Sequence, residues 1–125
     1  MRDFALQLTH RPGELARVAG ALSRRGVNIK SVAGLAMGNQ VLLRIFAYDL
    51  DAARSALQAS NIRFEENEVV TVLLENTAGQ LAAVSEKLAG AGVNLLAIYL
   101  TGFTEGLIEV AIVADDVKKA KKLLQ

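Results

Sequence analysis

Two short turns carry the residues of this sequence that are best suited to binding chemistry. The first comprises His10, Arg11, Pro12, Gly13, Glu14 and Leu15, and the second comprises Asn76, Thr77, Ala78, Gly79, Gln80 and Leu81. Each turn precedes a predicted helix, whose N-terminus offers unpaired backbone N–H groups and partial positive charge. Such a turn suits the carboxylate of a small ligand, and a glycine in it lets the ligand approach the backbone.

Two asparagines complete the candidate sites. Asn28 and Asn94 each follow a Gly-Val step and stand at the start of a predicted strand. An amide side chain both donates and accepts hydrogen bonds, so either asparagine could hold an amino group and a carboxylate. The plainer alternative is that Gly13 and Gly79 only allow a tight turn and each asparagine only satisfies nearby backbone groups. The residue chemistry leaves both interpretations open.

Other binding or catalytic chemistry finds little support. The chain has one histidine and no cysteine, and its serines lie outside a nucleophile motif, so we expect no catalytic residue, no metal and no cofactor. The one basic run, at residues 118–122, has no aromatic neighbours, and the net charge is only +1. Both observations favour a solvated helix face over a nucleic-acid site. We expect a cytoplasmic protein without membrane association, because there is no signal-peptide pattern and the apolar runs are short.

Hydrophobic periodicity predicts the elements that position the first turn. Phe4, Leu6 and Leu8 alternate with less apolar residues, as in a strand with one buried face. A helix with one apolar stripe follows, with Pro12 expected at its first position. In the second turn, Thr77 and Gln80 have the spacing of a capping box.

The chain after the first helix predicts two strands, a helix and a short strand. We expect strands at residues 27–37 and 40–48 joined by a Gly38-Asn39 hairpin, then a helix capped by Asp49 and a strand at residues 61–66. The order β-α-β-β-α-β predicts an α+β, ferredoxin-like unit. Such a unit has an antiparallel four-stranded sheet with both helices on one face.

The sequence contains this arrangement twice. At an offset of 66 residues, eight positions between Gly13 and Asn28 are identical to their counterparts between Gly79 and Asn94. Past the hairpin the offset is 67, so we place one inserted residue in the second hairpin, near Thr104-Glu105-Gly106. The second copy has no counterpart of residues 61–66. We therefore expect two ferredoxin-like domains, 1–67 and 68–125, the second without its fourth strand.

The first turn, its helix and Gly26-Val27-Asn28-Ile29 resemble the ACT domain, a small-molecule-binding regulatory module of amino-acid metabolism, here in two tandem copies. The resemblance implies copies that pack side by side. It also implies amino-acid sites between the glycine turn of one copy and the strand of the other. Asn28, Asn76 and Asn94 match polar positions of the family, whereas His10 and Ala78 depart from its pattern, so the two sites could differ in affinity or ligand.

This resemblance implies a free-standing regulatory protein that is not an enzyme. We expect it to bind a small amino acid at the interface of two ACT domains, to form a homodimer, and to signal through a partner. The alternative is a ligand-independent regulatory or assembly subunit that binds an enzyme of amino-acid metabolism. A third possibility, a small enzyme of ferredoxin-like fold, predicts turnover that is lost on His10→Ala.

Overall fold

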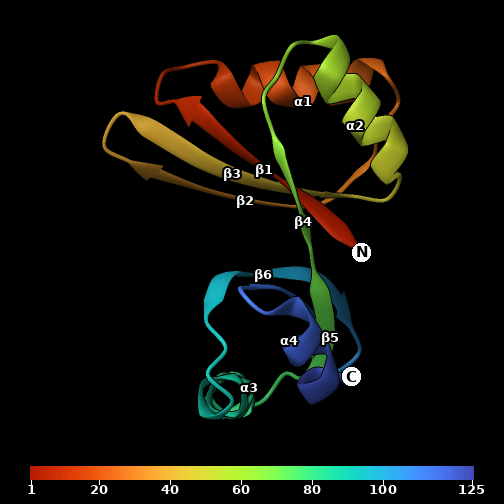
Figure 1. The fold of residues 1–125 in the computed structure, drawn as a ribbon. Helices are drawn as coiled ribbons and strands as arrows, with labels where there is room; N and C mark the ends of the chain where they lie inside the picture. The colour runs from red at the N-terminus through yellow and green to blue at the C-terminus, as the bar shows by residue number, and fades with distance from the viewer. The chain divides into compact units, whose positions relative to one another are not determined.

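The structure, a computed structural model, describes all 125 residues of the chain. The chain divides into two compact units, residues 2–67 and residues 68–125, the latter together with Met1. We call them the first unit and the second unit. Figure 1 shows their elements and labels most of them, and the same labels are used below.

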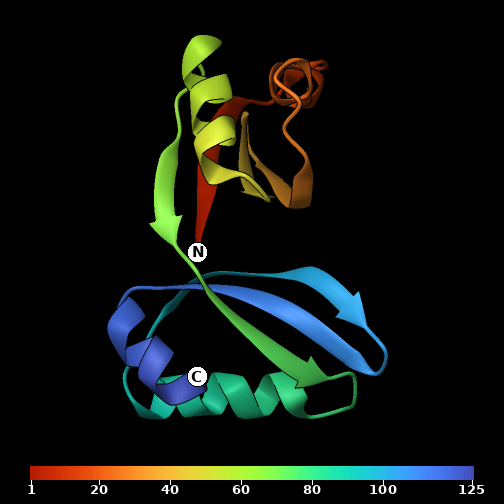
Figure 2. The ribbon, with the colours of Figure 1, turned by 90° about the vertical axis from the view of Figure 1, so that its right-hand side faces the viewer.

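The first unit has the predicted order of elements. Its elements are β1 (Arg2–Thr9), α1 (Glu14–Arg24), β2 (Ile29–Met37), β3 (Gln40–Ala47), α2 (Leu50–Ala59) and β4 (Glu65–Glu68). The sheet order is β2-β3-β1-β4, and both β1 and β2 run antiparallel to β3. The two helices cover one face of this sheet (Figure 2). The predicted ferredoxin-like arrangement is confirmed.

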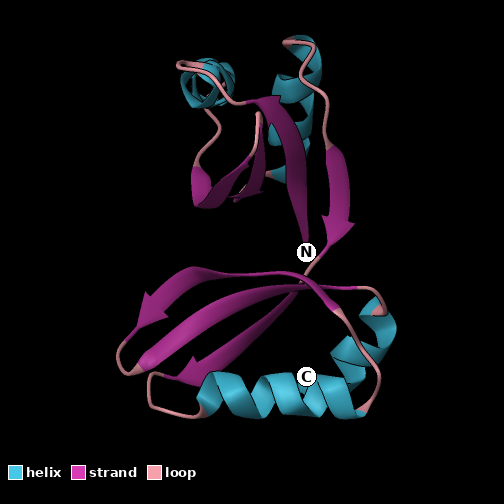
Figure 3. Ribbon diagram, turned by 90° about the vertical axis from the view of Figure 1, so that its left-hand side faces the viewer, coloured by secondary structure: helices cyan, strands magenta, loops and turns pink.

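The second unit repeats this arrangement without its last strand. Its elements are β5 (Val70–Glu75), α3 (Gln80–Gly90), β6 (Leu95–Thr104), β7 (Leu107–Ala114) and α4 (Val117–Leu124). The antiparallel sheet has the order β5-β7-β6, and α3 and α4 lie on one of its faces (Figure 3). The predicted absence of a fourth strand is confirmed, and β5 is an edge strand on the side where β4 stands in the first unit.

An aliphatic core holds each helix pair on its sheet. In the first unit, alternate residues of β1 place Phe4, Leu6 and Leu8 in the core, where they meet Val18 of α1. The Phe4 ring also meets Phe64 edge to face, with centroids 5.3 Å apart. The second core repeats this plan with Val70, Leu74, Val84, Leu88, Val110 and Ile112. This packing fixes where α1 and α3 begin relative to their sheets.

Both turns enter their helices through a glycine in the left-handed region. Gly13 has φ +90° and Gly79 has φ +89°, and each is the N-cap of the helix that starts at the next residue. The predicted start at Pro12 and the predicted capping box of Thr77 and Gln80 are therefore wrong, since neither helix has a side-chain cap. The physical reason is that positive φ strains an L-residue, so the glycine sets the point where the chain enters the helix.

The inserted residue of the second copy lies in a strand and not in the hairpin. Both hairpin turns have two residues, between Met37 and Gln40 and between Thr104 and Leu107. The register of β6 against β7 shifts between Leu100 and Gly102, where β2 has no such shift. The extra residue is therefore Thr101, accommodated as a β-bulge, and its hydroxyl donates to Glu109 Oε1 at 2.6 Å.

The fourth strand of the first unit starts later than predicted. Asn61 has φ +55° and Ile62 packs into the core, so pairing begins only at Glu65. Arg54 of α2 then holds Glu66 of β4 through two N–H groups of its guanidinium, Nη2 being 3.0 Å from Oε2. Hydrogen bonding from Arg54 lowers the pKa of the Glu66 carboxyl.

None of the helices has the length and apolarity needed to cross a membrane.

Candidate functional site

A groove lies beside the first turn, inside the first unit. Its volume is about 400 Å³, and it is open to solvent. Its lining comes from β1, the turn, the first residues of α1, and the facing part of the β2–β3 hairpin, namely Leu8, Arg11, Gly13, Glu14, Leu15, Ala16, Gly34, Leu35, Ala36, Val41 and Leu43. Four of the residues predicted for the first site, Arg11, Gly13, Glu14 and Leu15, are thus brought together with residues of three strands.

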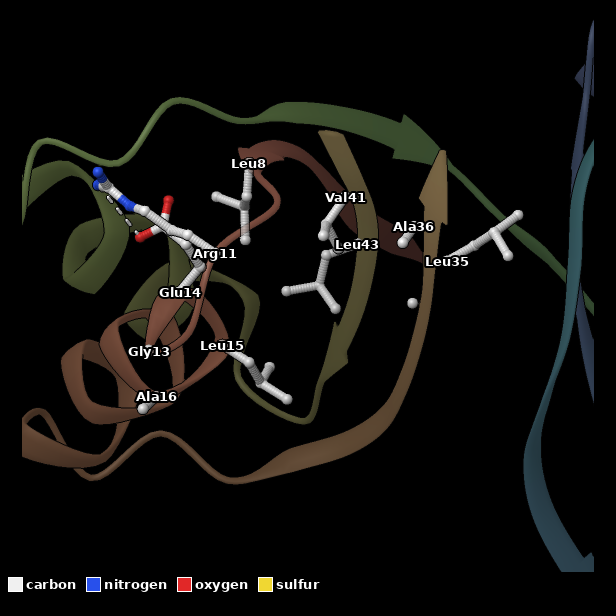
Figure 4. Close-up of a pocket in the computed structure, with 11 residues that line it drawn as sticks. Leu8, Arg11, Gly13, Glu14, Leu15, Ala16, Leu35, Ala36, Val41 and Leu43 are labelled. Carbon is white, nitrogen blue, oxygen red and sulfur yellow. Dashed lines mark ion pairs between the residues drawn. The ribbon is translucent and has the colours of Figure 1, made fainter. Parts of the chain in front are cut away.

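The walls of the groove are aliphatic. Leu15 of α1 and Leu43 of β3 point toward the same hollow from opposite sides, and Leu8 and Val41 close one end (Figure 4). The side chain of Leu35 points away, so this residue contributes backbone only. Leu15 is 57% exposed although it is a large apolar residue at the start of a helix. Leu8 and Leu43 are only 7% and 4% exposed, so Leu15 is the one of these three leucines with surface open to an apolar ligand group.

Two opposite charges stand at one end of the groove. Arg11 Nη2 lies 3.7 Å from Glu14 Oε2, and Arg17 Nε donates to the same oxygen at 3.1 Å. The Glu14 side chain is only 9% exposed, whereas that of Arg11 is 65% exposed. Hydrogen bonding from Arg17 is the main reason that the pKa of Glu14 lies below its usual value. Two cations thus hold the Glu14 carboxylate beside the groove, and the Arg11 side chain is the more exposed of the two.

Asn28 lies at the other end of the sheet from the first turn. The N–H of His10 donates to the carbonyl of Asn39 in the hairpin at 2.8 Å, which ties the turn to the end of β2. Asn28 precedes the start of β2, where its carbonyl accepts from the N–H of Tyr48. Neither Asn28, His10 nor Pro12 lines the groove. Within one unit, therefore, the turn and the asparagine do not meet.

The second unit repeats this separation. The N–H of Asn76 donates to the carbonyl of Gly106 in the hairpin at 2.9 Å. Asn94, before β6, accepts through its backbone carbonyl from the N–H of Asp115 at 3.1 Å, and its own N–H donates to the Asp115 carboxylate at 3.0 Å. The other predicted residues of this turn are Thr77, Ala78 and Gly79, followed by Gln80 and Leu81 at the start of α3. No three acidic or histidine side chains gather into a group that could hold a metal ion.

Sequence reasoning missed the groove residues that come from the strands. The available signal was Gly34, a glycine inside a predicted strand, which often marks a close approach of another group. A Cβ on Gly34 would come within 3.2 Å of Leu43 Cδ1. Gly34 and Ala36 are thus the small residues that leave the groove open on the β2 side.

No protein-family model matches the sequence, and no curated protein matches it. Several solved structures, in contrast, are similar to this chain. The protein BT0572 from Bacteroides thetaiotaomicron is 22% identical, with a TM-score of 0.87, over 98% of this chain and 84% of that one. The ligand-free regulatory subunit of aspartate kinase from Thermus thermophilus is 20% identical, with a TM-score of 0.66, over 98% of this chain and 88% of that one.

A whole enzyme also contains this fold. Aspartokinase III of E. coli, in complex with lysine and aspartate, is 19% identical, with a TM-score of 0.54, over 99% of this chain and 32% of that one. The similar structures therefore include both a regulatory subunit and a complete kinase. At these identities the likeness concerns the fold, and it confirms the resemblance at that level: the chain has the tandem ACT-like fold.

Proposed function

We propose that this chain is a non-catalytic regulatory module that binds a small amino acid at the interface of two ACT-like units and signals through a partner protein. The observation that carries the proposal is the groove beside Gly13, with aliphatic walls and a pair of opposite charges at one end. An α-amino acid has a carboxylate, an ammonium and a side chain. The N-terminus of α1, whose backbone N–H groups have no side-chain cap, adds a further attraction for the carboxylate.

Two of the similar structures support the ligand class and the regulatory role. One is the regulatory subunit of aspartate kinase, and another is aspartokinase III in complex with lysine and aspartate. This chain spans most of the former and about a third of the latter, 88% and 32% of their lengths. The likeness to a regulatory subunit over most of that chain's length supports the regulatory role that we propose.

The separation of Asn28 from the turn favours a site shared between two units. β2 and β6 each lie at the edge of their sheet and so leave one row of backbone groups unpaired. When two copies of such a strand pair antiparallel, the start of one lies beside the end of the other. We propose that Asn28 reaches the glycine turn of another copy in this way, within a homodimer.

Titration of the purified chain with each of the common amino acids tests this proposal. We expect at least one to give saturable heat by calorimetry and to raise the melting temperature, since a ligand that binds only the native state stabilises it. Asn28→Ala should weaken that binding, and Gln58→Ala, which removes an exposed amide from α2, should not. If no amino acid gives heat or a thermal shift, the proposal is wrong.

The alternative, a ligand-independent subunit that binds an enzyme of amino-acid metabolism, draws on a different observation. β5 is unpaired on its outer side, because the second unit has no counterpart of β4. An edge strand of this kind can accept a strand from another protein. Co-purification of such an enzyme, unaffected by Asn28→Ala and Asn94→Ala, would favour this function over amino-acid binding.

A further inference from the structure

The two units differ at the positions that form the β2 side of the groove. The strand register, together with the offset of 67 residues between β3 and β7, identifies the matched positions. Gly34 pairs with Leu43 in the first unit, and Leu100 pairs with Val110 in the second. Leu43 and Val110 are counterparts at the offset of 67 residues, so Leu100 stands where Gly34 stands.

At the next position on the same face of the strand, the first unit again has the smaller side chain. Ala36 pairs with Val41, and Phe103 pairs with Ile108, which is the counterpart of Val41. Glycine and alanine in the first unit are thus replaced by leucine and phenylalanine in the second. Leu100 and Phe103 are 47% and 75% exposed, so each places a large side chain on the side where the first unit is open.

The charged end of the groove is also particular to the first unit. At the positions of Arg11 and Glu14, the second unit has the neutral residues Thr77 and Gln80. The second unit therefore lacks both the opposite charges and the small strand residues. A ligand with two charged groups and an apolar part finds complementary chemistry beside Gly13 only.

We propose that the groove of the first unit binds an α-amino acid with an apolar side chain, and that the second unit has no equivalent site. This inference rests on the proposed function and narrows it to one unit and one class of side chain. Arg11 turns from Glu14 to the ligand carboxylate, and Glu14 accepts from the ligand ammonium. Arg17, at 3.1 Å, keeps Glu14 in place while Arg11 moves.

The walls select against polar side chains. A hydroxyl or amide placed against Leu15 and Leu43 would lose part of its water, and the side chains that line this part of the groove offer it no hydrogen-bond partner. The volume of about 400 Å³ lies within the usual range of ligand pockets, about 300–1,000 Å³. An apolar side chain, in contrast, gains from burial against these leucines.

Calorimetric titration of the full chain with leucine, isoleucine and phenylalanine, against serine, aspartate and lysine, tests the ligand class. We expect the apolar amino acids to bind roughly tenfold tighter or better, the change expected from burying about two extra methylene groups. The expected stoichiometry is one molecule per chain. Tighter binding of a polar amino acid, or two molecules per chain, would overturn this inference and leave the proposed function standing. If none of the common amino acids binds, both proposals fail together.

Gly34→Leu tests the location by giving the first unit the residue that the second unit has. We expect this variant to lose leucine binding and to keep its far-UV circular dichroism spectrum, since the atom nearest to the new Cβ, at 3.2 Å, is the end of the Leu43 side chain. Gly34→Ala should weaken binding to a smaller degree, which keeps the test open if the larger substitution fails to fold. Leu100→Ala is the matched control in the second unit and should leave the affinity unchanged. Full affinity in both Gly34 variants, or a loss in Leu100→Ala, would contradict the assignment.

Arg11→Met tests the charged end of the groove. Because a hydrogen bond to a charged group is lost, we expect leucine to bind roughly 10- to 100-fold more weakly. Arg25→Met removes an exposed cation at the opposite end of α1 and should not change the affinity. Equal effects of the two substitutions would show only a general charge effect, and the role of Arg11 would be refuted.

Discussion

The glycine turn of the second unit allows a sharp test of how these turns are built. Gly79 has φ +89° and ψ −12°, and an added Cβ would meet no atom within 4 Å. Gly79→Ala therefore introduces no clash. Its cost is the backbone strain of an L-residue with positive φ, about 1–2 kcal/mol.

Gly90→Ala is a matched control in the same unit. Gly90 is the last residue of α3, has no positive φ, and would also place its Cβ in open space. Alanine is the better helix former, so here the same substitution should stabilise the unit, by up to about 0.5–1 kcal/mol. The two variants add the same methyl group to the same unit, and they should change its stability in opposite directions.

Thermal unfolding followed by circular dichroism, at one pH and without ligand, measures the difference. For a domain of this size, each kcal/mol moves the melting temperature by about 4–8 °C. Gly79→Ala should therefore melt several degrees below wild type and Gly90→Ala at or above it. Gly79→Asn should recover part of the loss, since asparagine tolerates the left-handed region. Equal stability of wild type and Gly79→Ala, or equal losses in the two alanine variants, would refute the role assigned to the glycine.

Three further predictions concern the cap, an ion pair and the bulge. Asp49→Ala should cost about 0.5–2 kcal/mol of unfolding free energy in urea titrations, because its carboxylate caps α2 by accepting a backbone N–H at 3.0 Å. Glu66→Gln should lower the urea midpoint at pH 7 but not at low pH, because Arg54 lowers the folded-state pKa of the Glu66 carboxyl. The stabilisation by this carboxylate is fully present above its unfolded-state pKa of about 4.3 and is lost as the pH falls through its folded-state pKa. Deletion of Thr101 should cost less stability than deletion of Glu105, because the former removes a bulge and the latter shortens a two-residue turn.

Each of these predictions has an outcome that would contradict it. Asp49→Asn keeps an acceptor at the cap and should retain most of the stability, so an equal loss in the alanine and asparagine variants would exclude the capping bond as the cause. A deficit of Glu66→Gln that stays constant from pH 7 to pH 3 would exclude the ion pair with Arg54. If the Glu105 deletion variant were the more stable of the two, the inserted residue would lie in the hairpin turn and not at Thr101.

The sequence predicted the order of elements because each has a local signal. Alternation in β1, the Gly38-Asn39 turn and the Asp49 cap all act over a few residues, and the structure contains each of them. The repeat also predicted that the second sheet would have one strand fewer. Such signals depend on backbone preference and burial of one face, which neighbouring residues suffice to express.

The errors concern features that depend on pairing between distant residues. The change of offset from 66 to 67 could fall anywhere between Asn94 and Leu107, and only the hydrogen-bond register assigns the bulge to Thr101. Both helix starts were misplaced by two residues, because proline and threonine gave competing signals and the positive φ of the glycine prevailed.

Only the part of the candidate site whose residues are adjacent in the chain could be predicted from the sequence. The turn residues Arg11, Gly13 and Glu14 are adjacent in the chain and could be recognised together. The opposite wall could not, since Gly34 lines the groove only because β2 pairs with β3 in a register that sets it against Leu43. The position of Asn28 at the far end of β2 likewise follows from topology, and it separates this asparagine from the glycine turn of its own unit.

The most direct test of amino-acid binding in the first unit is a two-dimensional ¹H–¹⁵N NMR titration of the full chain with leucine. The groove predicts that the amide signals of Gly13, Leu15, Gly34 and Leu43 shift and saturate together, while those of Gly79, Leu81 and Leu100 stay in place. Saturable shifts confined to the second set, or no shifts at any leucine concentration, would contradict the account.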